Sequence, residues 1–148
     1  MKDSVSQELL SRFNAMHQSV NETYHRIAVR YQLSDCAFWI LYTLRDGSGA
    51  DTQDALCKAL CISKQTVNSA LKKLVANGLL TLESPASGEK RKRIRFTKKG
   101  EAFAAQTIDC VFELEREAFA PFTQEQWLGY LAMGNAYAKE LRRRAELL

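Results

Sequence analysis

The residues best suited to chemistry in this chain lie in one polar and basic segment between Ile62 and Leu80. On a helix at about 100° per residue, its amide, hydroxyl and lysine side chains fall on one face, namely Gln65, Asn68, Ser69 and Lys72. The opposite face is apolar and consists of Val67, Ala70, Leu71 and Leu74. Because amide and hydroxyl groups can bond base edges and phosphates, the segment predicts a helix that lies across DNA.

The positive charge of the chain is concentrated around the same segment. Residues 62–100 carry 10 basic and 2 acidic side chains, a net charge of +8, within a chain whose total is +4. The flanking residues 1–61 and 101–148 carry net charges of −1 and −3. A basic patch on a slightly acidic body is typical of a nucleic-acid binding surface. A solvated lysine-rich loop is the alternative explanation for the charge alone.

The composition excludes several other classes of protein. The chain has 148 residues, of which 46% are hydrophobic, so one domain with a substantial core is expected. No apolar run approaches the roughly 20 residues that span a bilayer, and the first residues lack the features of a signal peptide. We therefore expect a cytoplasmic protein without a membrane partner. No glycine-rich phosphate loop or nucleophile motif is present, so we predict neither an enzyme nor a bound cofactor.

The periodicity of apolar residues predicts a mainly α fold with six helices and a two-stranded β wing. The helices are expected at residues 5–30, 35–45, about 52–60, 63–77, 97 to about 119, and 123–148. Ser34, Ser63 and Thr97 are expected as N-caps, and Thr123 with Gln126 as a capping box. Between the fourth and fifth helices, residues 79–82 and 90–97 predict a hairpin with a basic return strand.

This order of elements predicts a winged helix-turn-helix lobe at residues 34–97. The helical segments 1–33 and 98–148 have apolar seams that a small domain could not cover, so we predict that both termini form a dimerisation region. A homodimer would also present two such helices to two half-sites about 34 Å apart on double-stranded DNA.

The chain resembles the MarR family of bacterial transcription regulators over its full length. The resemblance rests on the helix order, on LCISKQTVNSALKKLVANGLL (Leu60–Leu80), and on RIRFTKKG (Arg93–Gly100). The second string is similar to the strand-Leu-Thr-x-x-Gly closure of the family's wing. The resemblance implies a homodimer that binds a palindromic operator, more often as a repressor than as an activator. It also implies release by a small molecule, an oxidant or a metal.

Two positions depart from the family pattern. The family's wing usually has an Asp two residues before an Arg, whereas this chain has Gly88-Glu89-Lys90-Arg91 at the corresponding tip. The acidic brace of that arginine is therefore expected to be missing. The turn of the helix-turn-helix, where Gly or another small residue is frequent in the family, contains Cys61.

We assign the predicted DNA contacts by side-chain chemistry. Base edges are assigned to the amide and hydroxyl groups of the polar helix face, namely Gln65, Asn68 and Ser69. The DNA backbone is assigned to the cap, the first turn and the lysines, namely Ser63, Lys64, Thr66, Lys72 and Lys73. The start of the return strand suits phosphates or an adjacent minor groove, and it comprises Lys90, Arg91 and Arg93.

The resemblance also implies an effector pocket between the dimerisation helices and the DNA-binding lobe. Its candidate lining, which would suit a small aromatic or apolar effector, is Phe13, His17, Tyr24, Phe38, Trp39 and Tyr42. The spacing of these residues, taken alone, predicts only that they pack in a core.

The four cysteines are expected to be reduced thiols. Cys36 lies near the first turn of a predicted helix, where a thiol pKa is often lowered, so it is the candidate redox residue. Cys57 and Cys61 are four residues apart, which could place two thiolates on one metal. Because no acidic cluster flanks them and only two histidines are present, we predict core packing and no metal site. Cys110 is expected on an apolar helix seam, where it would be inert.

A winged helix that binds only proteins, or a scaffold dimer without specific DNA binding, is the alternative function. The two classes differ in salt dependence. Specific DNA binding predicts that duplex affinity falls steeply as the salt concentration rises, whereas a protein-only module would show no duplex affinity at any salt concentration.

Overall fold

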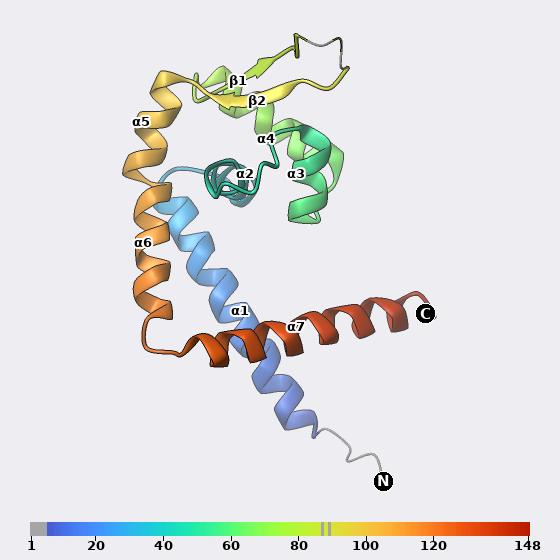
Figure 1. Cartoon of the computed structure of the whole chain (residues 1–148). Coiled ribbons are helices and arrows are strands. Elements are labelled where there is room, and N and C mark those ends of the chain that lie inside the picture. The colour runs from blue at the N-terminus through green and yellow to red at the C-terminus, as the bar shows by residue number, and fades with distance from the viewer. Residues whose placement is uncertain (1–5, 87, 89) are drawn as a thin grey trace. The chain divides into compact units, whose positions relative to one another are not determined.

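The computed structural model describes residues 6–86, 88 and 90–148. In chain order, its elements are α1 (Gln7–Arg30), α2 (Asp35–Arg45), α3 (Gln53–Leu60), α4 (Lys64–Ala76), β1 (Leu80–Glu83), β2 (Arg93–Phe96), α5 (Lys98–Gln106), α6 (Ile108–Phe119) and α7 (Gln124–Ala145). Figure 1 shows α3 followed by α4, then the two strands, then α5. The predicted fold class is confirmed: the protein is mainly α with a two-stranded wing. Val5, the first residue of the predicted N-terminal helix, lies outside the described residues.

The helix starts follow from side-chain capping, as the sequence predicts. Ser34 accepts a hydrogen bond from the Ala37 amide at 3.1 Å. Thr97 caps α5 in the same way, because its hydroxyl accepts from the Gly100 amide at 2.9 Å. Each cap satisfies one of the amides that a helix start leaves without a partner.

The core of the first compact unit, which ends at Asp109, is built around α2. Phe38, Ile40 and Leu41 are fully buried, and α2 contacts α1, α3 and α4. A helix that is apolar on nearly all sides requires neighbours on all sides. This surrounded position of α2 agrees with its sequence.

The hairpin is antiparallel and continues directly into α5. Leu80 is paired with Phe96 and Leu82 with Ile94. Ile94 is buried, whereas Leu82 on the paired strand is 43% exposed. The Thr97 amide donates to the Leu79 carbonyl at 3.1 Å, which fixes the end of β2 beside the start of β1.

The single helix predicted from Thr97 to about Phe119 is divided into α5 and α6 at Thr107. Thr107 has φ −126° and ψ −71°, and its hydroxyl donates to the Phe103 carbonyl at 2.7 Å. This back-bonding of a threonine hydroxyl competes with the regular ladder of a helix. Arg45 of α2 links the two sides of the break, because it is hydrogen-bonded to Asp109 at 2.9 and 2.7 Å and to Glu101.

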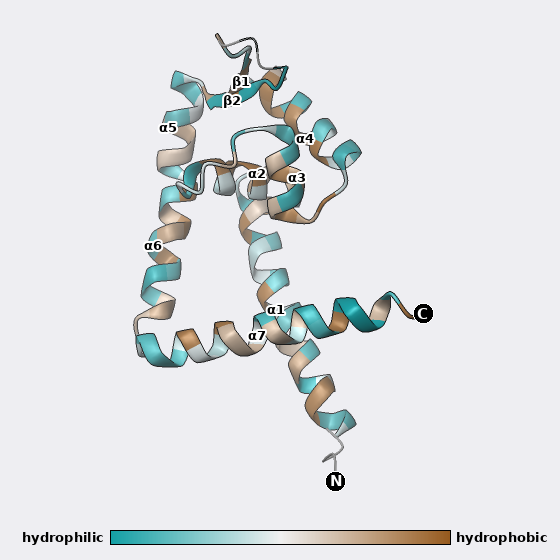
Figure 2. Ribbon diagram, turned by 45° about the vertical axis from the view of Figure 1, so that its right-hand side comes forward, coloured by the Kyte–Doolittle hydropathy of each residue, from teal (hydrophilic) through white to brown (hydrophobic). Residues whose placement is uncertain are grey.

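The second compact unit, Cys110–Leu148, contains most of α6 and all of α7. The predicted capping box of Thr123 and Gln126 begins α7. Trp127 stacks on Phe119 with ring centroids 3.8 Å apart, and its indole N–H donates to the Phe119 carbonyl at 3.2 Å. This stacking fixes the corner between α6 and α7. None of the residues of α7 is buried, although hydrophobic residues recur along the helix (Figure 2).

None of the described helices is both long and apolar enough to cross a membrane.

Gly100 provides the close approach between α5 and the start of β1. A Cβ at this position would lie 1.9 Å from the Leu79 carbonyl oxygen and 2.8 Å from the carbonyl carbon. We therefore expect Gly100→Ala to lower the free energy of unfolding by about 1–3 kcal/mol, measured by denaturant titration. Gly129→Ala is the matched control, because no atom lies within 4 Å of a Cβ there. The control should be neutral or stabilising, since Ala is the better helix former. Equal losses in the two variants would contradict this account of Gly100.

Candidate nucleic-acid interface

The predicted division of α4 into a buried and an exposed face is confirmed. The buried side chains of this helix are Val67, Ala70, Leu71 and Leu74. The predicted contact residues are on the other face: Asn68 is half-buried, and the exposed ones are Ser63, Lys64, Gln65, Thr66, Ser69, Lys72 and Lys73. A helix anchored by one face presents the other face in a fixed orientation, as base readout requires.

The start of α4 is held by its own hydroxyl groups. Ser63 is the N-cap, and its hydroxyl accepts from the Thr66 amide at 3.3 Å. The two hydroxyls of Ser63 and Thr66 are also hydrogen-bonded, at 2.9 Å. Gln53 at the start of α3 donates to the Lys64 carbonyl at 3.4 Å, which ties α3 to the first turn of α4.

The turn between α3 and α4 forms around Cys61, although the family frequently has a small residue at this position. Cys61 has φ 52° and ψ 38°, which is the left-handed conformation. Its amide donates to the Cys57 carbonyl, so it closes the end of α3 in the way a glycine commonly does. The side chain of Cys61 is exposed, and its thiol donates to the Lys58 carbonyl at 3.8 Å.

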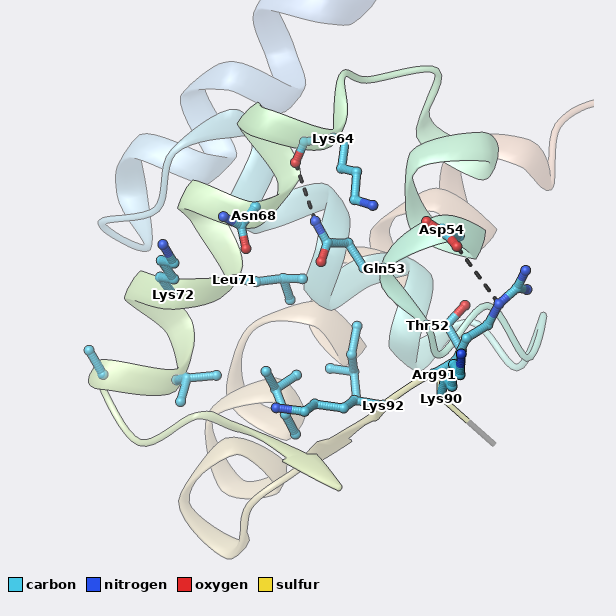
Figure 3. Close-up of a pocket in the computed structure, with 14 residues that line it drawn as sticks. Thr52, Gln53, Asp54, Lys64, Asn68, Leu71, Lys72, Lys90, Arg91 and Lys92 are labelled. Atoms are coloured by element: carbon cyan, nitrogen blue, oxygen red, sulfur yellow. Dashed lines mark hydrogen bonds and ion pairs between the residues drawn. The ribbon is translucent and has the colours of Figure 1, made fainter. Parts of the chain in front are cut away.

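A groove with a volume of about 510 Å³ lies between α4, the start of α3 and the wing. Figure 3 shows its polar lining, in which Asn68 and Lys72 come from α4 and Lys90, Arg91 and Lys92 come from the wing. Its apolar floor consists of Leu71, Val75, Ala76, Leu82 and Ile94. The groove therefore brings three of the predicted contact residues of α4, Lys64, Asn68 and Lys72, together with two of those of the wing, Lys90 and Arg91.

Lys92 and Gln53 are among the groove residues that were absent from the predicted site. Lys92 extends across the groove in Figure 3. Lys92 lies within the basic run Lys90–Arg93, so the sequence could have identified it as a candidate DNA contact. Gln53 faces the groove from α3, and a polar residue at a helix start carries no comparable signal. Gln65, Ser69 and Lys73 are exposed but do not line this groove.

Arg93 and Arg95 of β2 share an acidic brace that the sequence did not predict. Asp51, in the loop before α3, accepts from Arg93 and from Arg95, each at 2.6 Å. Arg91 is more loosely paired with Asp54, at 3.8 Å. Burial would raise the pKa of Asp51, but the hydrogen bonds from Arg95 and Arg93 lower it below its ordinary value. The predicted absence of a brace at the wing tip stays a prediction, because Glu89 lies outside the described residues. The sequence did not predict the pairing of Asp51, because it joins residues about 40 positions apart, which no local pattern reveals.

The structure corrects the assignment of Cys36 as a thiol with a lowered pKa. Burial, together with the nearby Cys57, raises the pKa of Cys36. Burial disfavours the thiolate, and this outweighs the benefit expected near a helix start. The core packing predicted for Cys57 and Cys61 is wrong for Cys61, which is exposed, whereas Cys57 is half-buried. Cys110, which was predicted on a helix seam, is exposed. No group of three or more metal-ligating side chains occurs among the described residues.

The six predicted effector-site residues fall into two groups. Tyr24, Phe38, Trp39 and Tyr42 form one aromatic cluster, with ring centroids between 4.8 and 6.1 Å apart. Phe13 and His17 form a separate edge-to-face pair at 4.5 Å. Seven residues of helix separate His17 from Tyr24, a distance of about 10 Å along α1. Phe38 of the first group is fully buried, so this group contributes to the packing of the core, as the spacing of its residues predicts.

These elements define a winged helix-turn-helix protein. A family model described as MarR family matches residues 31–91, the segment from the end of α1 to the wing. Over these residues, the match confirms the family resemblance predicted from the sequence. No curated protein sequence matches the chain.

Solved structures agree over nearly the whole chain. The MarR family regulator NMB1585 from Neisseria meningitidis superposes with a TM-score of 0.80 at 22% identity, covering 96% of this chain and 98% of that one. The MepR–DNA complex from Staphylococcus aureus gives 0.70 at 17% identity, with 95% and 99% covered. Staphylococcus aureus MarR in complex with salicylate and kanamycin gives 0.68 at 20% identity, with 95% of each chain covered. The chain therefore has the fold of MarR family regulators.

The ion pairs of Asp51 predict a specific pH dependence. We expect its carboxyl, followed by NMR, to titrate below the ordinary range of an aspartate. Because its pKa is lower in the folded than in the unfolded state, its stabilising contribution is complete above the unfolded-state pKa. That contribution is lost as the pH falls through the folded-state pKa. Arg95→Gln removes one donor and should move the midpoint upward. A midpoint at or above the ordinary range in the unaltered protein would contradict the pairing.

Proposed function

We propose that this protein is a sequence-specific double-stranded DNA-binding transcription regulator that acts as a homodimer on a palindromic operator. In this proposal it is a repressor, and a small molecule or an oxidative signal releases it from DNA. Its role is binding and not catalysis.

The groove between α4 and the wing is the observation that carries the proposal. On one side, α4 presents amide, hydroxyl and lysine groups from an anchored helix, which suits the major groove of about 12 Å width. On the other side, the wing presents Lys90, Arg91 and Lys92. A phosphate backbone that follows the groove would meet cationic groups from both elements.

The MepR–DNA complex supports this assignment by analogy, since a protein of the same fold was solved with DNA. The salicylate complex of Staphylococcus aureus MarR likewise supports a small aromatic effector. For this chain we propose that the aromatic cluster on α1 and α2, which contains Tyr24, Trp39 and Tyr42, contributes to the effector site.

Exposed apolar side chains on the terminal helices support the homodimer. On α7, Leu128, Leu131 and Leu141 are each more than half exposed. Leu9 of α1 is 55% exposed. Apolar surface of this extent along two helices is expected to be covered by a partner, and a second copy would also supply the second DNA-contacting helix.

Substitutions in the helix and the wing should have different effects on DNA binding. Once a site has been selected from a random duplex pool, Gln65→Ala and Asn68→Ala should relax sequence preference by about 1–3 kcal/mol at particular base pairs. Lys92→Ala and Arg91→Ala should weaken all duplexes alike and lower the slope of log affinity against log salt by about one unit each. Fluorescence anisotropy over a salt series measures both effects. Absence of duplex affinity at every salt concentration would favour the protein-binding alternative.

The homodimer predicts that Ala138→Glu dissociates the protein. The substitution places a charge midway along α7, and an unpaired buried charge there should cost several kcal/mol. Sedimentation equilibrium measures the loss of dimer. Lys139→Glu is the matched control at the adjacent position, because it adds a carboxylate at a residue that is charged already. A dimer that survives Ala138→Glu unchanged would remove this part of α7 from the interface.

A further inference from the structure

Asp51, which lies just before α3, is bonded to three consecutive residues of the wing, namely Arg93, Ile94 and Arg95. Its carboxylate accepts from Arg93 and Arg95 at 2.6 Å each, and its backbone carbonyl accepts from the Ile94 amide at 2.7 Å. Side chains two apart on a strand point to the same face, so one carboxylate reaches both arginines. Ile94 lies between them and is buried.

The segment that carries Asp51 is itself held in place by the capped start of α3. Asp51 immediately precedes Thr52, whose hydroxyl accepts from the Ala55 amide at 3.2 Å as the N-cap of α3. Thr52 is only 8% exposed. α3 in turn packs against α4. A movement of the wing relative to α4 would therefore break the charge-assisted bonds of Asp51.

The residues next to this attachment are the cationic residues of the groove. Lys90, Arg91 and Lys92 directly precede Arg93, and they line the groove opposite Asn68 and Lys72. The position of Asp51 therefore determines how far these side chains stand from α4. The carboxylate is also mostly enclosed, since the Asp51 side chain is 18% exposed.

We propose that Asp51 is a positioning residue for DNA recognition: it holds the wing at the distance from α4 at which one DNA backbone contacts both. This inference rests on the proposed function. It assigns Arg93 and Arg95 mainly to the attachment of the wing, and it assigns phosphate binding to the three cationic residues before them.

Removal of the Asp51 carboxylate should change DNA affinity in opposite directions according to this positioning role and according to charge alone. Removing an acid near a DNA-binding surface should by charge alone strengthen DNA binding. If Asp51 positions the wing, its removal should weaken binding to the selected operator. Asp54 offers a matched control, because it is an exposed acid three residues away whose ion pair with Arg91 is long, at 3.8 Å.

The experiment compares Asp51→Asn, Asp51→Glu and Asp54→Asn in the full chain, with a selected operator and a random duplex. We expect Asp51→Asn to weaken operator binding about tenfold, the scale of one hydrogen bond to a charged group. Affinity for the random duplex should stay level or rise, so the specificity ratio falls. Asp51→Glu, which keeps the carboxylate, should recover part of that ratio. Asp54→Asn should leave the ratio unchanged and strengthen both affinities, by at most about threefold.

A measurement without DNA separates the positioning of the wing from the proposed function. The Ile94 amide should exchange with solvent faster in Asp51→Asn than in the unaltered protein or in Asp54→Asn, because loss of the ion pairs frees the wing. Unchanged exchange would overturn the positioning role, and so would equal loss of operator and random-duplex affinity, which indicates general destabilisation. An unaltered protein that binds no duplex would overturn the proposed function and, with it, the role of Asp51 in DNA recognition. The exchange data would still report on the wing itself.

Discussion

The packing of the apolar face of α4 against α2 and α3 is the constraint on which the other features of the site depend. Leu71 and Leu74 are almost fully enclosed, so α4 cannot rotate about its axis without exposing them. Each such side chain contributes about 1.5–3 kcal/mol of burial free energy. The core therefore sets the orientation of the polar face, before any of the DNA contacts that we propose for it.

The wing is positioned by a different kind of interaction. β1 and β2 are only four residues long each, and an isolated two-stranded hairpin is marginally stable. Its support comes from the close approach at Gly100 on one side and from the ion pairs of Asp51 on the other. Placing a carboxylate near a surface that we propose binds phosphates carries an electrostatic cost. The two arginines that Asp51 holds compensate for it, since they leave a net positive charge at the wing.

The sequence predicts the helices well and the long-range contacts poorly, for physical reasons. Ser34, Ser63 and Thr123 each accept from the amide three positions ahead, so capping can be recognised in a linear pattern. The burial of Val67 and Leu74 follows from helical periodicity for the same reason. By contrast, the pairing of Asp51 with Arg93 depends on the tertiary fold, which brings β2 back beside the loop before α3. The division at Thr107 arises from one hydroxyl, and threonine is common enough within helices that its presence predicts no break.

The environment of α2 suggests how a signal from the proposed effector site would reach α4, the helix that we propose contacts DNA. Phe38 belongs to the aromatic cluster with Tyr24 and Trp39, and α2 is also the helix against which α4 packs. A ligand that enters the cluster can change DNA affinity only through its difference in affinity for two arrangements of the protein. A release of about 100-fold requires about 2.7 kcal/mol of such a difference. That free energy is comparable to the burial of one large apolar side chain. Repacking around a single residue of α2 could therefore supply the required difference in affinity. Because Phe38 is fully buried in a densely packed core, and because α2 also packs against α4, a repacking of α2 offers a route from the aromatic cluster to α4.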